Sequence, residues 1–391
     1  MNPMDEDHNR NLIFISLAQF GMAMSANFIM VFLPFYTLKI SPYSSQETLI
    51  WVGLIMGAHP FVVMIASNFW GILTSRFSPK LLYMRGFLAN TVLFLLMGFT
   101  SSLHVLLILR IIQGVFGGIS TVGLIIISSS SSREKMPADI GFFQTFLTLG
   151  QLVGPPIGAL AASVFGYRGA FVSVSIFLLI VIIFSYLNVE EVPLQSKQEK
   201  LFGRSTVNQQ TIVAWILCFA ATVQLMFLPS VLPNVFEKFN MERTIALKWA
   251  GVVIMIYTAT ATLGTYFWTR VSLRFGRDRM ILLLVILGTL FQSSLSLNRG
   301  MVDFIVIRMI QTGLIAAAIP LVISIFAAEL KGGTIGFLNS ARFAGNAFGP
   351  MIATSILAIS NLTSLYLFIS GLTLLALFGF KFLSKSSFYP Q

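Results

Sequence analysis

Acidic residues are scarce in this chain of 391 residues, which has 14 of them against 25 lysines and arginines. Charged residues of both signs make up only 10% of the sequence, whereas soluble domains usually contain about 25%. Apolar residues account for 56%, and the mean hydropathy is +0.85. A soluble protein with so few charges could not cover that much apolar surface. The sequence therefore predicts an integral membrane protein.

Cysteine is nearly absent, since Cys218 is the only one in the sequence. An internal disulfide and a metal site built from several cysteines are therefore excluded. No GxxxxGK[ST] loop, pair of carboxylates or nucleophile with a suitable base stands out, so we expect no ATP-driven pumping, no enzyme activity and no cofactor. The net charge of +11 does not indicate a nucleic-acid partner, because the cations concentrate in one set of predicted loops. The N-terminal residues MNPMDEDHNR lack the basic start of a secretory signal, and we expect no cleavage there.

Long apolar segments predict twelve transmembrane helices. A helix needs about 20 mostly apolar residues to cross about 30 Å of hydrocarbon. Such segments lie near residues 12–37, 49–74, 80–100, 103–128, 139–165, 168–189, 209–236, 246–271, 279–298, 302–328, 335–359 and 362–384. Continuous apolar runs such as 177–184 do not fit the alternating pattern of β-barrel strands. We expect a six-helix half at 1–189, a polar cytoplasmic linker at 190–208 and a second six-helix half at 209–391.

The cations are unevenly distributed between the two sets of loops. The even-numbered connections and both tails hold 16 lysines and arginines, whereas the opposite connections hold 6. Because cytoplasmic loops are enriched in these residues, we expect an inner or plasma membrane protein with both termini in the cytoplasm. The remaining three of the 25 lie inside predicted spans; they are Arg110, Arg308 and Arg342.

The sequence contains an internal repeat, in which four groups of residues recur in the same order. The recurring groups are Phe69-Trp70 with Arg76-Phe77 and Phe267-Trp268 with Arg274-Phe275; Arg110 with Gln113 and Arg308 with Gln311; Gly141-Phe142 with Gln144 and Gly336-Phe337 with Asn339; and Gly150, Gly154 and Pro155 with Gly345, Gly349 and Pro350. The offset is 198 residues for the first two groups and 195 for the last two. This duplication predicts two parallel six-helix halves with a substrate site near the membrane midplane between them.

Three of these segments resemble motifs of a known family. RIIQGVFGG (Arg110–Gly118) is similar to the fourth-helix motif of the major facilitator superfamily. GQLVGPPIGA (Gly150–Ala159) is similar to the fifth-helix signature of its drug:proton antiporter branches, and GILTSRFSPK (Gly71–Lys80) to its loop between the second and third helices. The resemblance covers essentially the whole chain. It implies an all-α membrane fold of twelve helices that transports small molecules by alternating access.

The loop motif departs from the family pattern, because Ser75, Ser78 and Pro79 replace the usual Asp, Gly and basic residue. In the family this loop forms a charge-based latch, so the latch is in doubt here. The residues that the resemblance links to conformational change are Gly71, Arg76, Lys80, Gly150, Gly154, Pro155, Gly158, Gly345, Gly349 and Pro350. Gly150, Gly154 and Gly158 share one helix face and predict close packing. That face is either a packing seam only or, together with the eighth helix, a pivot that opens and closes.

Arginines inside spans are costly, so they normally contact protein or line water. Arg110 and Arg308 either bind backbone carbonyls of a neighbouring helix or line the cavity, where Arg110 would bind an anionic group or sense protonation. Arg342 could act likewise or extend to the inner headgroups. Gln113 and Gln311 either connect helices or contact substrate.

None of the 14 acidic residues lies near the middle of a predicted span. Uncharged amides are present instead, with Asn27 near the middle of the first predicted helix and Gln224 in the seventh. A cavity with arginines and without a buried acid should attract anions and repel permanent cations. His59, near the middle of the second predicted helix, is our first candidate for proton coupling; a neutral, hydrogen-bonded histidine is the alternative.

These features predict a secondary transporter that exports small amphiphilic molecules in exchange for protons. The expected cargo is a neutral or anionic metabolite, siderophore or drug. We expect a monomer whose partners are this cargo, protons and membrane lipid. Uptake of a small anionic nutrient and lipid flipping are the alternatives.

Overall fold

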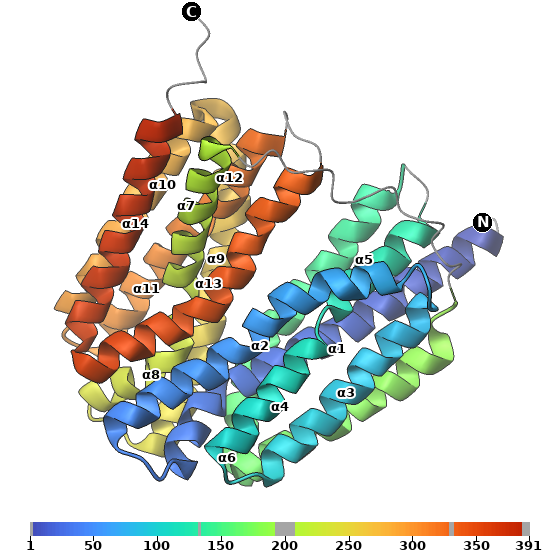
Figure 1. Cartoon of the computed structure of the whole chain (residues 1–391), viewed down its shortest axis with the longest axis horizontal. Coiled ribbons are helices and arrows are strands. Elements are labelled where there is room, and N and C mark those ends of the chain that lie inside the picture. Colours follow the sequence, from blue (N-terminus) through green and yellow to red (C-terminus); the bar gives the residue numbers. More distant parts are fainter. Residues whose placement is uncertain (1–2, 132–133, 192–207, 328–331, 385–391) are drawn as a thin grey trace, which may run out of the picture. The chain divides into compact units, whose positions relative to one another are not determined.

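The computed structural model describes residues 3–131, 134–191, 208–327 and 332–384, and the regular elements in these ranges are all helices (Figure 1). The first group comprises α1 (Pro3–Ile40), α2 (Ser45–Leu73), α3 (Pro79–Phe99), α4 (Leu103–Val115), α5 (Ile119–Ser130) and α6 (Met136–Asn188). The second group comprises α7 (Gln209–Met226), α8 (Leu228–Lys238), α9 (Arg243–Phe275), α10 (Arg277–Ser294), α11 (Met301–Ile315), α12 (Ala318–Ala327), α13 (Gly332–Ile359) and α14 (Leu362–Ser384), with a short 3-10 turn at Leu295–Leu297. Most of the expected linker at 190–208 lies outside the described residues.

The described helices account for the twelve predicted spans. Ten segments are long and apolar enough to cross a membrane, and the longest of them, Ala138–Asn188, contains two helical arms. Counting these arms separately and adding α13 gives twelve. Many large side chains on these helices are exposed and apolar, for example Leu187 at 73% and Ile359 at 87%. A soluble protein would not expose so many, so these surfaces face lipid and the chain is a multi-pass membrane protein.

Three spans are interrupted, which the apolar pattern did not predict. The interruptions separate α4 from α5, α7 from α8 and α11 from α12. Gly118 directly precedes α5 and has a φ of +88°, a backbone conformation that glycine adopts without strain because it has no side chain. Pro229 lies in the first turn of α8 and has no N–H to continue the hydrogen bonds of α7.

The two arms of α6 meet at Gly166, whose φ is +70°. A β-carbon added at Gly150 or Gly158 would collide with the backbone of α1 at Phe20 or Phe28, so the first arm runs parallel to α1. The second arm runs the opposite way, because Phe171 contacts Phe32 and Phe184 contacts Phe14, with ring centroids 5.0 and 5.2 Å apart. The chain therefore reverses its direction at a single residue.

Contacts divide the chain into two compact units. One unit comprises residues 1–41, 62–199 and 243–255, and the other comprises 42–61, 200–242 and 256–391. α2 and α9 are therefore each shared between the units. In the first unit α1 packs on both arms of α6. In the second unit α7 packs against α13 and α14. The six-helix halves predicted at 1–189 and 209–391 remain a prediction.

Candidate functional site

Arg110 lies on α4 and keeps 9% of its surface exposed. Its Nη1 donates to Oε1 of Gln113 at 2.6 Å, and Nε2 of Gln113 donates to Oδ1 of Asn90 at 3.0 Å. Asn90 in turn donates to the backbone oxygen of Gly86 at 2.8 Å. The guanidinium is thus linked through two amides to the backbone of α3. The sequence reasoning missed Asn90, although an amide in the middle of a span was a visible signal.

Arg308 lies at the corresponding position of the repeat, on α11, and is only 1% exposed. Its Nη1 donates to Oε1 of Gln311 at 2.7 Å, which reproduces the bond between Arg110 and Gln113. The same Nη1 also donates to the backbone oxygen of Gln224 at 3.0 Å, and Nη2 donates to that of Leu225 at 2.7 Å. Arg308 therefore binds backbone carbonyls of a neighbouring helix, the first of the two alternatives.

The carbonyls that Arg308 binds lie at the end of α7, where the helix is interrupted. In a continuous helix the oxygen of Leu225 would accept from the N–H of residue 229. Residue 229 is proline, so this donor is missing and Nη2 of Arg308 takes its place. A membrane interior offers no water to satisfy such a carbonyl, so the Arg308 guanidinium supplies the hydrogen bond that the chain itself lacks.

Aromatic rings surround the Arg308 guanidinium, whose central carbon lies 5.0 Å from the ring centres of both Phe227 and Tyr257. Four polar atoms in this region are buried without a partner among the described residues. They are Nε of Arg308, Nε2 of Gln311 and the hydroxyl groups of Tyr257 and Tyr366. Buried polar atoms of this kind are uncommon, and they usually bind water or a ligand.

Gln224 connects three helices of the second unit. Its Nε2 donates to the backbone oxygen of Gly288 at 3.1 Å, and its Oε1 accepts from Oγ1 of Thr373 at 3.1 Å. The side chain is fully buried. This geometry matches the helix-connecting role that an amide inside a span can have.

Asn27 and His59 are both half-buried. Asn27 donates to the backbone oxygen of Ala23 at 2.8 Å. His59 lies on α2 between two residues that contact α13, namely Gly57 at the backbone of Ala347 and Phe61, whose ring centre is 5.9 Å from that of Phe348.

Arg342 lies on α13 and is exposed.

The distribution of acidic groups agrees with the sequence pattern. Among acidic residues whose side chains the structure describes, Asp139 is the buried one, and it lies in the first turn of α6. The others are exposed at helix ends or connections. Beyond the first turns of the described helices, the buried charged side chains are therefore the cations Arg110 and Arg308.

The glycine face of α6 forms a close packing seam, but with a different helix from the one that the pivot alternative named. Gly150, Gly154 and Gly158 contact α1 and not the eighth predicted helix, because a β-carbon at any of them would collide with the α1 backbone. Their counterparts Gly345 and Gly349 contact α7, the first helix of the second repeat. The pivot alternative was wrong about the partner helix of this face, because spacing identifies a face but not the helix that covers it.

The eighth predicted helix, α9, packs on the neighbouring face of α6. A β-carbon added at Gly251 would lie 2.7 Å from Cβ of Ala159 and 2.8 Å from the backbone oxygen of Pro155. At the repeat-related position, a β-carbon added to Gly53 of α2 would likewise collide with the side chain of Thr354 and approach the backbone oxygen of Pro350 on α13. Sequence reasoning missed this pair, although the two glycines are separated by the repeat offset of 198 residues.

The loop motif has acquired new contacts in place of the usual charges. Oγ of Ser78 donates to Oε1 of Glu191 at 3.3 Å and accepts from the backbone N–H of Leu81 at 3.4 Å, so this serine caps α3. Nζ of Lys80 lies 5.2 Å from the ring centre of Tyr186. Arg76 is exposed, and Gly71 lies within α2.

A repeated set of transmembrane helices with amides and cations buried among them is typical of a membrane transporter. A profile described as Major Facilitator Superfamily matches residues 15–297 and 213–389. The chain belongs to the Major Facilitator Superfamily, as its motifs suggested.

Similar proteins extend over nearly the whole chain. The multidrug resistance protein MdtG of Rahnella sp. (strain Y9602) is 23% identical over 384 residues, which is 95% of this chain and 93% of MdtG. A staphyloferrin B transporter of Staphylococcus aureus (strain NCTC 8325 / PS 47) is 24% identical over 363 residues, which is 88% of this chain and 86% of that transporter. The crystal structure of the nucleoside transporter NupG covers 100% of both chains, with a TM-score of 0.80 and 12% identity. That last likeness concerns the fold alone.

Proposed function

We propose that this protein exports small neutral or anionic amphiphiles across the inner or plasma membrane in exchange for protons, by alternating access. Both termini would face the cytoplasm. The names of two relatives, one for multidrug resistance and one for staphyloferrin B transport, support a small-molecule cargo. The fifth-helix motif supports export coupled to protons.

The observation that carries the proposal is the sign of the charge inside the spans. Arg110 and Arg308 are buried there, whereas the acidic side chains that the structure describes lie at helix ends or in connections. Cations fixed in a low-dielectric interior attract anions and disfavour a permanent cation. This charge pattern favours a neutral or anionic cargo.

The two arginines would have different roles. Arg308 is 1% exposed and is bound to the end of α7, which supports a structural role. Arg110 is more exposed, and the pair formed by Gln113 and Asn90 holds its orientation. We assign cargo binding to Arg110, whose guanidinium can form two parallel hydrogen bonds with a carboxylate or phosphate.

His59 is the proposed proton carrier. A histidine has an unperturbed pKa near 6.5, so it can change its charge under ordinary conditions. Among the acidic side chains that the structure describes, the buried one is Asp139, and it lies in the first turn of α6 and not in the middle of a span. The half-buried position of His59 would allow contact with water.

The test is proton flux in proteoliposomes, measured with a panel of anionic, neutral and permanently cationic compounds. We expect neutral or anionic compounds to drive flux. Robust exchange of a permanently cationic dye would overturn the assignment of cargo charge. Flux that requires loading from the opposite side would instead indicate uptake.

A further inference from the structure

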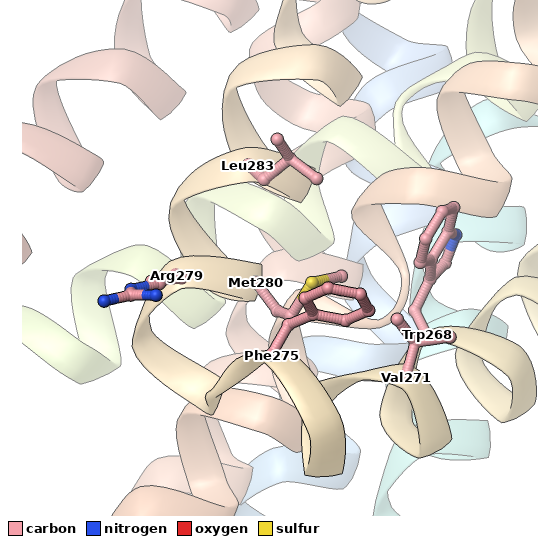
Figure 2. Close-up of a pocket in the computed structure, with 6 residues that line it drawn as sticks. All are labelled: Trp268, Val271, Phe275, Arg279, Met280 and Leu283. Carbon is pink, nitrogen blue, oxygen red and sulfur yellow. The ribbon is translucent and has the colours of Figure 1, made fainter.

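A pocket of about 310 Å³ lies between the end of α9 and the start of α10. Its apolar wall is formed by Trp268, Val271, Phe275, Met280 and Leu283. Figure 2 shows these apolar side chains on the facing sides of the two helices, while the guanidinium of Arg279 points away from them. Phe275 and Leu283 are 64% and 47% exposed, so the pocket opens on the surface of the helices.

At the matching location in the first unit, an arginine side chain lies against the tryptophan. Trp70 is the counterpart of Trp268, and its Nε1 donates to the backbone oxygen of Val115 at 2.6 Å. The guanidinium of Arg85 lies 5.4 Å from the ring centres of both Trp70 and Phe116. Residue 283 is the counterpart of Arg85 at the offset of 198, and it is leucine. The second copy has therefore lost the side chain that covers this tryptophan in the first.

Cations line the end of the helices beside the open pocket. Arg270, Arg274, Arg277 and Arg279 lie there with one acidic residue, Asp278. Arg270 stacks on Tyr266 at 4.2 Å, and Arg277 donates to the backbone oxygen of Ser324 at 3.0 Å. In the described part of the chain no acidic group pairs with Arg274 or Arg279, and both are exposed. The apolar slot is thus lined at one end by the exposed Arg279, and the exposed Arg274 precedes its lining residue Phe275 in the chain.

We propose that this pocket binds an anionic phospholipid, with an acyl chain against Trp268 and Leu283 and the phosphate group on Arg279 and Arg274. An apolar slot at the end of a membrane-spanning helix suits a lipid chain, and basic residues near the membrane surface each contribute about 1 kcal/mol of attraction to anionic lipid, a factor of about fivefold. The site is independent of the transport cargo.

The decisive variant restores the first-unit arrangement in the second unit. Leu283→Arg adds a cation but places its guanidinium over Trp268, as Arg85 lies over Trp70. If charge alone attracted the lipid, binding would increase, whereas filling the slot should decrease it. Leu273→Arg is the matched control, because Leu273 lies on the same end of α9, is 74% exposed and does not line the pocket.

The experiment is native mass spectrometry of the full chain released from nanodiscs that contain equal amounts of phosphatidylglycerol and phosphatidylcholine. We expect wild-type protein and Leu273→Arg to retain phosphatidylglycerol, and Leu283→Arg to lose it, because the added side chain fills the slot. A double variant, Arg274→Gln with Arg279→Gln, leaves the slot intact and should lose the preference for the anionic lipid. Equal retention of the two lipids by wild-type protein, or undiminished phosphatidylglycerol on monodisperse Leu283→Arg, would overturn the proposal.

Discussion

Arg308 donates from Nη2 to the backbone oxygen of Leu225 at 2.7 Å, the oxygen whose helical partner is missing because residue 229 is proline. A side chain on α11 thus completes the hydrogen bonding of α7. The arrangement explains how a fully buried cation is tolerated in a span, since the guanidinium replaces a backbone donor and lies against two aromatic rings.

Replacing Arg308 by Met should destabilise the protein, because the oxygens of Gln224 and Leu225 would lose their donor. Each carbonyl left unsatisfied costs about 1–3 kcal/mol. Pro229→Ala restores an N–H at residue 229 and should recover part of this loss in the double variant. Thermal unfolding in detergent measures the effect, with exposed Arg299→Met as control. An unchanged unfolding midpoint for Arg308→Met would contradict the structural role.

Replacing Arg110 by Gln should abolish transport of an anionic cargo while the protein still inserts and folds. Arg110→Lys keeps the charge but loses the planar fork, and we expect transport to fall by about tenfold or more, equivalent to about 1.4 kcal/mol. Initial rates in proteoliposomes provide the measurement, with exposed Arg299→Gln as the matched control. Near-normal transport by Arg110→Gln would remove this residue from the mechanism.

Replacing His59 by Asn should separate exchange from proton coupling. Without a group that gains and loses a proton, cargo counterflow should continue while transport driven by a pH gradient is lost. Both activities can be measured in the same vesicles. If the variant retained gradient-driven transport, another proton carrier would have to be sought.

Gly158→Ala should disrupt the packing of α6 on α1, because the added β-carbon would collide with the backbone of Phe28. Gly371→Ala on α14 is the control, since no atom lies within 4 Å of its added β-carbon. There alanine should be neutral or stabilising by about 0.5–1 kcal/mol, because it lowers the flexibility of the unfolded chain. Thermal unfolding and yield of monodisperse protein report both changes, and equal behaviour of the two variants would contradict the close contact.

The spans could be predicted from sequence because the length of an apolar run directly reflects the thickness of the bilayer. The interruption at Phe227 could not, since proline also occurs inside helices that continue, such as α13 at Pro350. At Pro229 the missing donor is replaced by Arg308 of α11, which is 83 residues from Leu225 in the chain.

For the site residues too, some relationships could be predicted from the sequence and others could not. Position in the repeat predicted that Arg110 and Arg308 are equivalent, and their bonds to Gln113 and Gln311 agree. The other hydrogen-bond partners of these arginines depend on which helices are neighbours, so the sequence did not reveal the bond from Gln113 to Asn90. The helix that covers Gly154 was also beyond local sequence patterns, because spacing alone does not identify a neighbour.

The reversal at Gly166 has a mechanical consequence. One residue can extend a chain by only about 3.3–3.6 Å, so the fifth and sixth spans have almost no slack between them. Neither can slide along its axis by a full helical turn without pulling the other. The two arms of α6, each packed on α1, should therefore move together as one rigid body when the protein changes conformation.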